Sequence, residues 1–172
     1  MGATQQGADA TTGRWLTIPR TLCFILNGND VLLMKRNPHR RIFPNQYNGL
    51  GGHIESSEDP YTAAVREIKE ESGLDVSNVK LRAIHNINAG ESTGIMLFVF
   101  TAHSSSRDLI ADEREGTLHW IDVNSLDQYD LVEDLPLLLP RILVMSEDPQ
   151  PYFGYVSYDE DDNIRIQYAN EE

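Results

Sequence analysis

The sequence predicts an α/β fold, in which one domain is built on a mixed sheet lying between helices. Its 172 residues suffice for a single domain with a real core. Hydrophobic residues make up 40% of the chain, as in globular proteins. Segments with strand character lie before and after those with helical character, and no repeat or linker separates them. This order favours a mixed sheet sandwiched between helices.

The first 14 residues, "MGATQQGADATTGR", are mostly small and polar. We expect residues 1–14 to be a flexible leader, or a cloning scar, ahead of a domain at residues 15–172. The leader lacks the basic and apolar regions of a secretory signal, and no stretch reaches the roughly 18 apolar residues of a membrane helix. Cys23 is the only cysteine and lies in an apolar run, which predicts a small buried residue. These features favour a cytoplasmic protein without a membrane partner.

The domain is expected to begin with two strands joined by a tight turn. Residues 16–27 are strand-like, with Pro19 near the start, where a missing N–H is tolerated. The sequence "NGND" is a turn signal, and residues 31–36 follow as the second strand. A polar, basic loop at residues 37–46 and a short segment, "YNGLGGHIE", then lead towards the first helix.

Residues 60–72 are predicted to form that helix. Asp59 suits the N-cap, Pro60 the first helical position, and Gly73 the C-terminal stop. Apolar residues at spacings of i, i+3, i+4 and i+7 predict a stripe that faces the core. The stripe consists of Tyr61, Ala64, Val65 and Ile68.

The second half of the domain adds strands and another helix. The expected strands are residues 79–87, 94–103 and 116–123, followed by a closing hairpin of residues 152–159 and 163–168. Residues 135–145, "LPLLLPRILVM", are predicted to be helical, although Pro140 leaves the start of the helix open.

Three glutamates crowd one side of the predicted helix. At about 100° per residue, Glu67, Glu70 and Glu71 fall within a wedge of roughly 100°, turned roughly 120° from the apolar stripe. We therefore expect the stripe to pack on the sheet and the carboxylates to point outward along one edge. A solvated acidic face is one explanation. However, negative charge is disfavoured in the last helical turn, and a bound divalent cation would reverse that penalty.

The neighbouring residues distinguish these explanations. Gly52, Glu58 and the run "REIKEESGL" at residues 66–74 agree in type and spacing with every fixed position of the Nudix box. The chain therefore resembles the Nudix hydrolase superfamily. The resemblance implies an α/β/α sandwich that uses Mg²⁺, or Mn²⁺ in its place, to hydrolyse a nucleoside diphosphate linked to another group.

The resemblance also implies a set of metal ligands. Glu67 and Glu71 would be the core ligands, and Glu70 would complete the cluster or orient water. Any one of the three is a candidate general base. Gly51 would contribute its backbone carbonyl, because glycine allows the backbone to approach a metal closely.

Two further features belong to the implied site. Arg66 would pair with Glu58 and hold the loop against the helix, the alternative being a solvated arginine. Glu115 is a fourth candidate for a metal ligand or base, because some Nudix enzymes carry a glutamate in that loop. It is otherwise an ordinary loop acid, and Glu113 or Asp112 could take the same role.

Substrate residues are suggested by a likeness to the MutT-type and mammalian oxidised-purine nucleoside triphosphatases. Asn48 matches an asparagine that contacts the purine, and its alternative role is that of a turn residue before Gly49. His53 replaces a phosphate-contacting lysine, and a neutral histidine is a weaker phosphate partner. Glu133 and Asp134 stand closest to the paired acids that read the base, although Asp134 is also a candidate N-cap.

We expect a Mg²⁺-dependent Nudix pyrophosphohydrolase that cleaves a nucleoside triphosphate, such as 8-oxo-dGTP, to monophosphate and pyrophosphate, a role in nucleotide pool sanitation. The alternatives are a diphosphohydrolase of another derivative, such as a nucleotide sugar, and a non-catalytic nucleotide-binding module. His39, Arg40 and Arg41 would contact the phosphates or form a solvated loop. The net charge of −13 argues against a nucleic-acid partner. A small nucleotide is the expected partner, and the chain would be a monomer or a homodimer.

Overall fold

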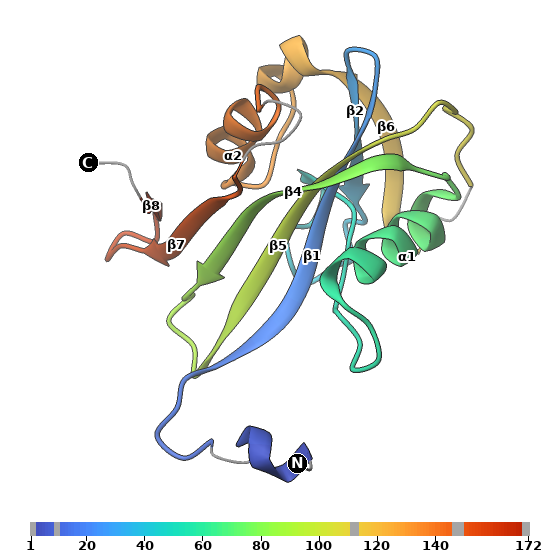
Figure 1. Cartoon of the computed structure of the whole chain (residues 1–172). Coiled ribbons are helices and arrows are strands. Elements are labelled where there is room, and N and C mark those ends of the chain that lie inside the picture. Colours follow the sequence, from blue (N-terminus) through green and yellow to red (C-terminus); the bar gives the residue numbers. More distant parts are fainter. Residues whose placement is uncertain (1–2, 9–10, 111–113, 146–149, 170–172) are drawn as a thin grey trace.

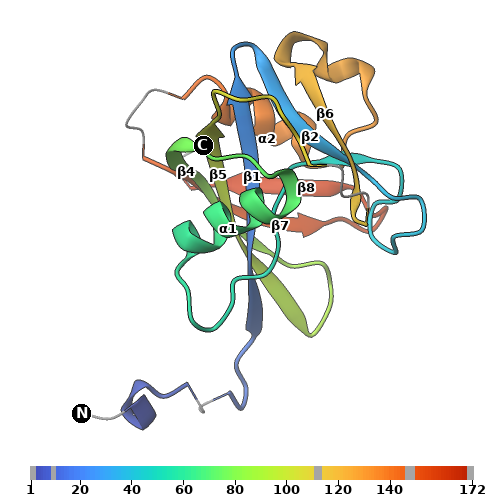
Figure 2. The same cartoon turned by 90° about the vertical axis from the view of Figure 1, so that its right-hand side faces the viewer.

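The computed structural model describes residues 3–8, 11–110, 114–145 and 150–169. A mixed eight-stranded sheet lies between α1 (Pro60–Ser72) and α2 (Leu135–Ile142), in agreement with the predicted α/β sandwich. The helices lie on opposite sides of the sheet (Figure 1), and from the side α1 stands in front of the central strands (Figure 2). Within the described residues, no helix combines the length and apolar character that crossing a membrane requires.

The sheet has the strand order β3-β2-β1-β5-β4-β7-β8, and β6 pairs with β2. The strands are β1 Leu16–Asn27, β2 Asp30–Arg36, β3 Tyr47–Asn48, β4 Ser77–Ile87, β5 Thr93–His103, β6 Gly116–Asp122, β7 Tyr152–Tyr158 and β8 Ile164–Tyr168. Short 3₁₀ turns occur at Ala3–Gln6 and Val123–Gln128. The β1–β5 and β4–β7 pairs are parallel, and the other pairs are antiparallel.

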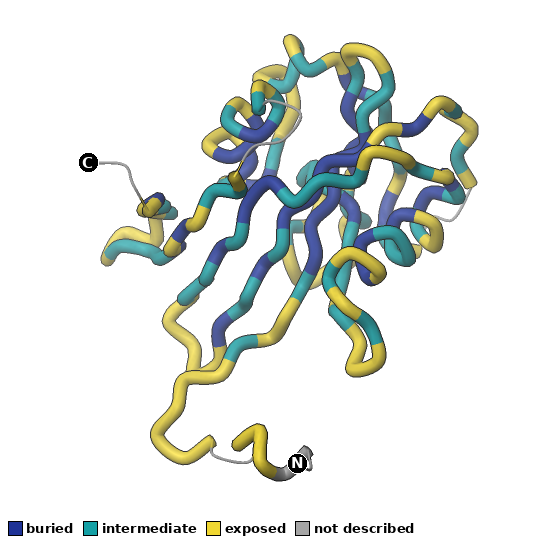
Figure 3. Tube along the Cα trace, in the orientation of Figure 1, coloured by how far each residue is buried: buried dark blue, intermediate teal, exposed yellow. Residues whose placement is uncertain are grey.

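Side-chain alternation along β1 divides the core into two layers. Leu22 and Phe24 pack with the apolar face of α2, whereas Cys23 and Ile25 pack with the apolar face of α1. Successive strand residues point to opposite faces, and both faces of this strand are covered by a helix. Cys23 is buried, as the sequence predicts. The buried segments gather where the helices cover the sheet, and exposed residues mark the strand ends farthest from them (Figure 3).

The strands β1 and β2 pair only beside their hairpin turn, from Ile25↔Leu32 to Asn27↔Asp30. Beyond these pairs, the segment of residues 47–54 lies between the two strands. Its first two residues pair with β2. Leu50 then exchanges backbone hydrogen bonds of 2.6 and 3.0 Å with Cys23. Of the expected "YNGLGGHIE" segment, only β3 is a strand, and the remainder is held in place by β1.

Local signals set both ends of α1 as predicted. The Asp59 side chain accepts hydrogen bonds from the backbone N–H groups of Tyr61 and Thr62, at 2.8 and 3.0 Å. At the other end, Gly73 has a left-handed φ of 76°, and its N–H donates to the Lys69 carbonyl at 2.9 Å. These caps satisfy backbone groups that a helix end would otherwise leave unpaired.

The predicted core-facing stripe of α1 is partly wrong. The buried residues of the helix are Ala63, Ala64, Ile68 and Ser72. Tyr61 is 53% exposed, so it lies outside the packed face. The inward face is therefore rotated towards the glutamates, because the short side chains of Ala63 and Ala64 leave room for the helix to approach the sheet on that side.

Candidate active site

The rotation of α1 turns two of the three glutamates towards the sheet. The Glu67 side chain is only 15% exposed, whereas that of Glu70 is 59% exposed. Glu71 follows buried Ala64 by seven residues, so the two lie about 20° apart around the helix. The expectation that all three carboxylates point outward is wrong. Glu67 and Glu71 face the loop that lies between β1 and β2, and Glu70 lies at the rim.

Two glycines make room for these inward carboxylates. Gly51 has φ 134°, and its backbone N–H donates to the Glu71 carboxylate at 2.8 Å. A Cβ atom at Gly51 would lie 2.4 Å from the Thr21 carbonyl oxygen, and one at Gly52 would lie 2.5 Å from a Glu67 carboxylate oxygen. A side chain at Gly51 would therefore clash with backbone, whereas one at Gly52 would displace the Glu67 carboxylate.

Arg66 connects the loop to the acidic face of the helix. Its guanidinium donates two hydrogen bonds to the Glu58 carboxylate, at 3.0 and 2.6 Å. One terminal nitrogen also donates to Glu67 at 2.9 Å and to Glu70 at 3.1 Å, while the other donates to the His53 carbonyl at 3.2 Å. The pKa of the Glu58 carboxyl lies below its usual range because of the bond from Arg66. A bidentate arginine–carboxylate pair is strongly directional. The pair with Glu58 therefore fixes the Arg66 guanidinium, which in turn positions Glu67.

The inward carboxylates are in an unfavourable electrostatic environment. Burial raises the pKa of Glu71 to about 7, and the negative charges of Glu67 and Glu115 act in the same direction. Burial also raises the pKa of Glu67, and Glu70 and Glu58 add to the effect. Burial and neighbouring negative charges both disfavour the ionised form of a carboxyl group. A cation placed among them would favour ionisation.

A pocket of about 260 Å³ opens beside these glutamates. It is lined by Met34, Arg40, Glu67, Glu70, Glu71, Arg114 and Glu115. Glu115 reaches it because β6 runs antiparallel to β2, with Gly116 opposite Arg36. The Glu115 carboxylate forms an ion pair with Arg40. The alternative residues Asp112 and Glu113 lie outside the described residues.

A larger hollow of about 520 Å³ lies at the β7–β8 turn. Its central carboxylate, Asp159, already accepts hydrogen bonds from the backbone of Asp161 and Asn163 and from Arg165. These bonds hold the pKa of Asp159 at about 2. This hollow is an open hairpin surface whose acid is used to close the turn, so the smaller pocket is the one with available chemistry.

The donors in the smaller pocket suit a hard divalent cation, which prefers carboxylate oxygens. In the part of the chain that the structure describes, no three acidic, histidine or cysteine side chains converge on one point as ligands do. One Arg66 nitrogen instead holds an oxygen of Glu67 and an oxygen of Glu70. Each carboxylate has a second oxygen, and the Glu70 side chain is exposed, so its single bond to Arg66 can be exchanged for solvent or a cation. The residues therefore fit a cation after small side-chain changes.

Residues predicted to contact the substrate are not all brought to this pocket. The Asn48 side chain accepts a hydrogen bond from its neighbour Gly49 at 2.8 Å, as a turn residue does. The His53 side chain is exposed. Neither lines the pocket beside the glutamates.

The acidic pair before α2 forms a separate group. Asp134 stands at the N-cap position of α2, as the sequence allowed, but it has helical backbone angles and its side chain makes no cap hydrogen bond. Pro136 lacks an N–H at a position where a capping oxygen would bind. Burial, helped by the charge of Glu133, raises the pKa of Asp134 to about 6. A hydrogen bond to Glu133 joins burial in raising the pKa of Tyr158.

Sequence reasoning did not single out Thr21 or Met34. Thr21 contacts the glycine loop, with Gly52 N–H donating to its hydroxyl at 3.4 Å, and Met34 lines the pocket. The Thr21–Gly52 contact joins residues 31 positions apart. No local pattern reports such a contact, so only the strand pairing could have revealed it.

Comparison with known proteins places the fold in a family. The model described as NUDIX domain matches residues 16–142. The chain is 28% identical over 106 residues to the uncharacterised Nudix hydrolase YvcI of Bacillus subtilis, a match covering 59% of this chain and 65% of that protein, which is just under two thirds of its length. It is 29% identical over 148 residues to the oxidized purine nucleoside triphosphate hydrolase of Danio rerio, covering 84% and 88%.

Among solved structures, the mutator MutT protein from Bacillus halodurans superposes with a TM-score of 0.74 at 21% identity. The match covers 90% of this chain and 99% of that one. At this level of identity, the likeness establishes the fold.

Proposed function

This chain belongs to the Nudix family, and from that premise we propose that it is a hydrolase of diphosphate linkages, namely a Mg²⁺-dependent pyrophosphohydrolase of nucleoside triphosphates. Its favoured substrates would be oxidised purine deoxynucleotides such as 8-oxo-dGTP, cleaved to a monophosphate and pyrophosphate. The observation that carries the proposal is the pocket in which four glutamates face Arg40 and Arg114.

The glutamates differ in side-chain exposure, and we assign them different roles on that basis. Glu67 and Glu71 face inward and would hold the cation together with the Gly51 carbonyl. When bound, Mg²⁺ would neutralise the diphosphate and make its phosphorus a better electrophile. Glu70, at the rim with 59% of its side chain exposed, is reached by solvent and would orient the attacking water. Glu115, which lines the same pocket, would complete the oxygen set.

Arg66 acts as a positioning residue in this proposal. Its two bonds to Glu58 fix the guanidinium, and its other bonds place Glu67 and Glu70. Small displacements of positioned groups slow phosphoryl transfer strongly. Loss of the Arg66–Glu58 contact would therefore lower the rate without removing any metal ligand.

The substrate class is supported by the zebrafish relative, whose name gives oxidised purine nucleoside triphosphates. Asn48, Glu133 and Asp134 are the proposed base contacts, and His53 is a proposed phosphate contact. An amide and a carboxylate together offer the donors and acceptors that a purine edge requires. The Asn48 oxygen already accepts the Gly49 N–H, so its NH2 group and the second lone pair of the oxygen would make the base contact.

A nucleotide panel tests the proposal. Canonical and oxidised nucleoside triphosphates, diphosphates and nucleotide sugars would each be incubated with and without Mg²⁺, and the products identified. Pyrophosphate plus a monophosphate from oxidised purine triphosphates is the expected result. Two monophosphates from a nucleotide sugar would favour a diphosphohydrolase instead.

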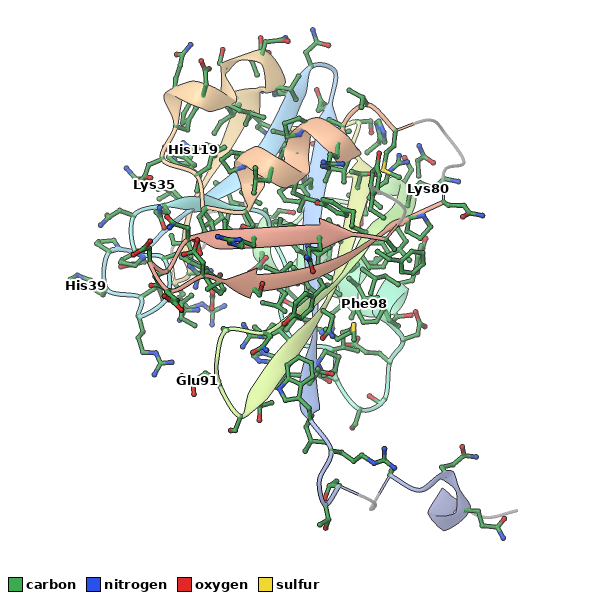
Figure 4. All side chains as sticks on the ribbon, turned by 90° about the vertical axis from the view of Figure 1, so that its left-hand side faces the viewer. Lys35, His39, Lys80, Glu91, Phe98 and His119 are labelled. Atoms are coloured by element: carbon green, nitrogen blue, oxygen red, sulfur yellow. The ribbon has the colours of Figure 1, made fainter. Side chains whose placement is uncertain are left out.

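A matched pair of variants tests the ligand assignment. Glu71→Gln should abolish turnover while the fold is retained, because an amide is a poor ligand for Mg²⁺. Glu91→Gln is the control, since Glu91 is an exposed residue of the β4–β5 loop (Figure 4). Equal activity of the two variants would contradict the assignment.

A further inference from the structure

The loop of residues 37–46 carries a guanidinium into the candidate active site. The ends of the loop are closed by hydrogen bonds between Arg36 and Gln46, at 2.9 Å, and between Asn45 and Arg36, at 3.1 Å. The Arg36 side chain also donates to the Ile42 carbonyl at 2.9 Å. The loop therefore has a defined path.

The first turn of this loop is joined directly to Glu115. The backbone N–H of Asn37 donates to the Glu115 carbonyl at 3.0 Å, and that of Arg40 donates to the Asn37 carbonyl at 3.0 Å. The Arg40 side chain then pairs with the Glu115 carboxylate. Backbone contacts thus hold Arg40 beside Glu115 even when their side chains separate.

Arg40 differs from the two basic residues beside it in the loop. Arg40 lines the pocket. His39 lies at the outer end of the loop and points away from the molecule (Figure 4), and the exposed Arg41 is not among the residues that line the pocket.

The Arg40–Glu115 ion pair is easily exchanged. The side chains of Arg40 and Glu115 are 41% and 45% exposed. Ion pairs that are this exposed to solvent contribute little to folding stability. A phosphate offers a guanidinium two parallel, charge-assisted hydrogen bonds, a stronger arrangement. A polyphosphate entering the pocket would therefore compete well with Glu115 for Arg40.

The charges around Arg40 also favour a polyanion. Burial lowers the pKa of Arg36, and the positive charges of Arg40 and Arg20 act in the same direction, whereas the negative charges of Glu115 and Glu71 oppose it. Two guanidiniums, including that of Arg40, line the pocket itself. Bound phosphate oxygens would reduce the repulsion between them.

We propose that Arg40 and Glu115 are an exchangeable pair, in which Arg40 leaves Glu115 to bind the terminal phosphate of a nucleoside triphosphate and Glu115 turns to the cation. This inference rests on the proposed function. It makes Arg40 the residue that selects a triphosphate over a diphosphate, because a triphosphate carries one more phosphate group for Arg40 to bind while the rest of its tail is held at the α1 carboxylates that line the same pocket. No bond to the phosphate is made or broken in the exchange.

Binding measurements without turnover test the exchange. Calorimetry would give the affinity of non-hydrolysable nucleoside triphosphate and diphosphate analogues with Mg²⁺, and of Mn²⁺ alone, for the wild type, R40A, R40K and R41A. In R40A, we expect triphosphate binding to weaken about 10- to 100-fold, with diphosphate binding changed less than about threefold. Mn²⁺ alone should bind equally well or more tightly, because Glu115 has lost its competing partner.

The other variants sharpen the result. R41A should bind both analogues and Mn²⁺ as the wild type does. R40K should retain part of the triphosphate preference, because lysine keeps the positive charge but cannot donate two parallel hydrogen bonds to one phosphate. Equal weakening of both analogues in R40A, or weaker Mn²⁺ binding, would show a structural role and overturn the proposal, as would a wild type without triphosphate preference. If the wild type binds with the expected preference but hydrolyses no nucleotide, the proposed function fails while this inference stands.

Discussion

Adjacent glycines of the candidate site should respond differently to the same small substitution. Gly51→Ala places a methyl group 2.4 Å from a backbone oxygen of Thr21, at a φ of 134° that side chains rarely adopt. Gly52→Ala places its methyl group 2.5 Å from a Glu67 carboxylate oxygen, at the end of a flexible side chain. The first clash can be relieved only by moving β1 or the loop, and the second by rotating one carboxylate.

The sizes of the two effects follow from these contacts. For Gly51→Ala, strained backbone and the displaced pairing with β1 should cost about 2–4 kcal/mol of unfolding free energy. In a chain of this size, such a loss lowers Tm by roughly 5–15 °C. For Gly52→Ala, only the Arg66–Glu67 contact is at risk, which limits the loss to about 1.5 kcal/mol. Misplacing Glu67 by roughly 1 Å should nevertheless slow hydrolysis about 100-fold.

Urea denaturation, thermal melting and steady-state hydrolysis of the best panel substrate would be measured for both variants and the wild type. We expect Gly51→Ala to be the unstable variant, and Gly52→Ala to be stable but slow, with weakened Mn²⁺ binding. A Gly52→Ala protein with normal kcat, or a Gly51→Ala protein with normal stability, would refute the packing of the glycine loop described above.

Three further predictions concern buried charge and the cation. Without metal at pH 8, Glu71→Gln should raise the unfolding free energy by about 1–3 kcal/mol. The reason is that the pKa of Glu71 is raised to about 7 in the folded protein, so ionisation of this carboxyl destabilises the wild type as the pH rises from about 4.5 to 7. Urea denaturation at pH 4 and pH 8 in the presence of a chelator should show the gain only at pH 8. Mg²⁺ should raise the Tm of the wild type and much less that of Glu67→Gln, and equal shifts would exclude Glu67 as a ligand. His85 is fully buried, neither of its ring nitrogens has a hydrogen-bond partner among the described residues, and burial lowers its pKa to about 4. The unfolding free energy of the wild type should therefore fall by about 1–3 kcal/mol between pH 6.5 and 4 through this group. His85→Leu should remove that part of the acid sensitivity and leave kcat unchanged, and identical curves of stability against pH for the two proteins would contradict the role of His85.

Local features could be predicted because they depend on near neighbours in the chain. Asp59 binds backbone groups two and three residues ahead, and Gly73 ends the helix by its own φ, so the bounds of α1 follow from the sequence. The hairpin turn between β1 and β2 likewise depends on the sequence Asn27–Asp30. The order of strands and helices then indicated the α/β sandwich.

The rotation of α1 was the part of the site that periodicity described wrongly. The apolar pattern treats Tyr61 as a core residue and the glutamates as outward. In the structure, Tyr61 is exposed and Glu71 accepts a hydrogen bond from Gly51. A carboxylate can face inward only where a particular donor meets it, and hydrophobic periodicity contains no information about a donor 20 residues away.

The sequence by itself determined the helix with its caps, the turn of the first hairpin, the apolar segments of the sheet and the family of the glutamate motif. Tertiary structure alone decided that residues 47–54 lie between β1 and β2, which carboxylates are buried, and that Arg40 meets Glu115, 75 residues away. The physical reason is that capping and turn formation are settled by atoms within a few residues. The charge and packing of the site instead depend on which distant strands pair, and this depends on the free energy of the whole sheet.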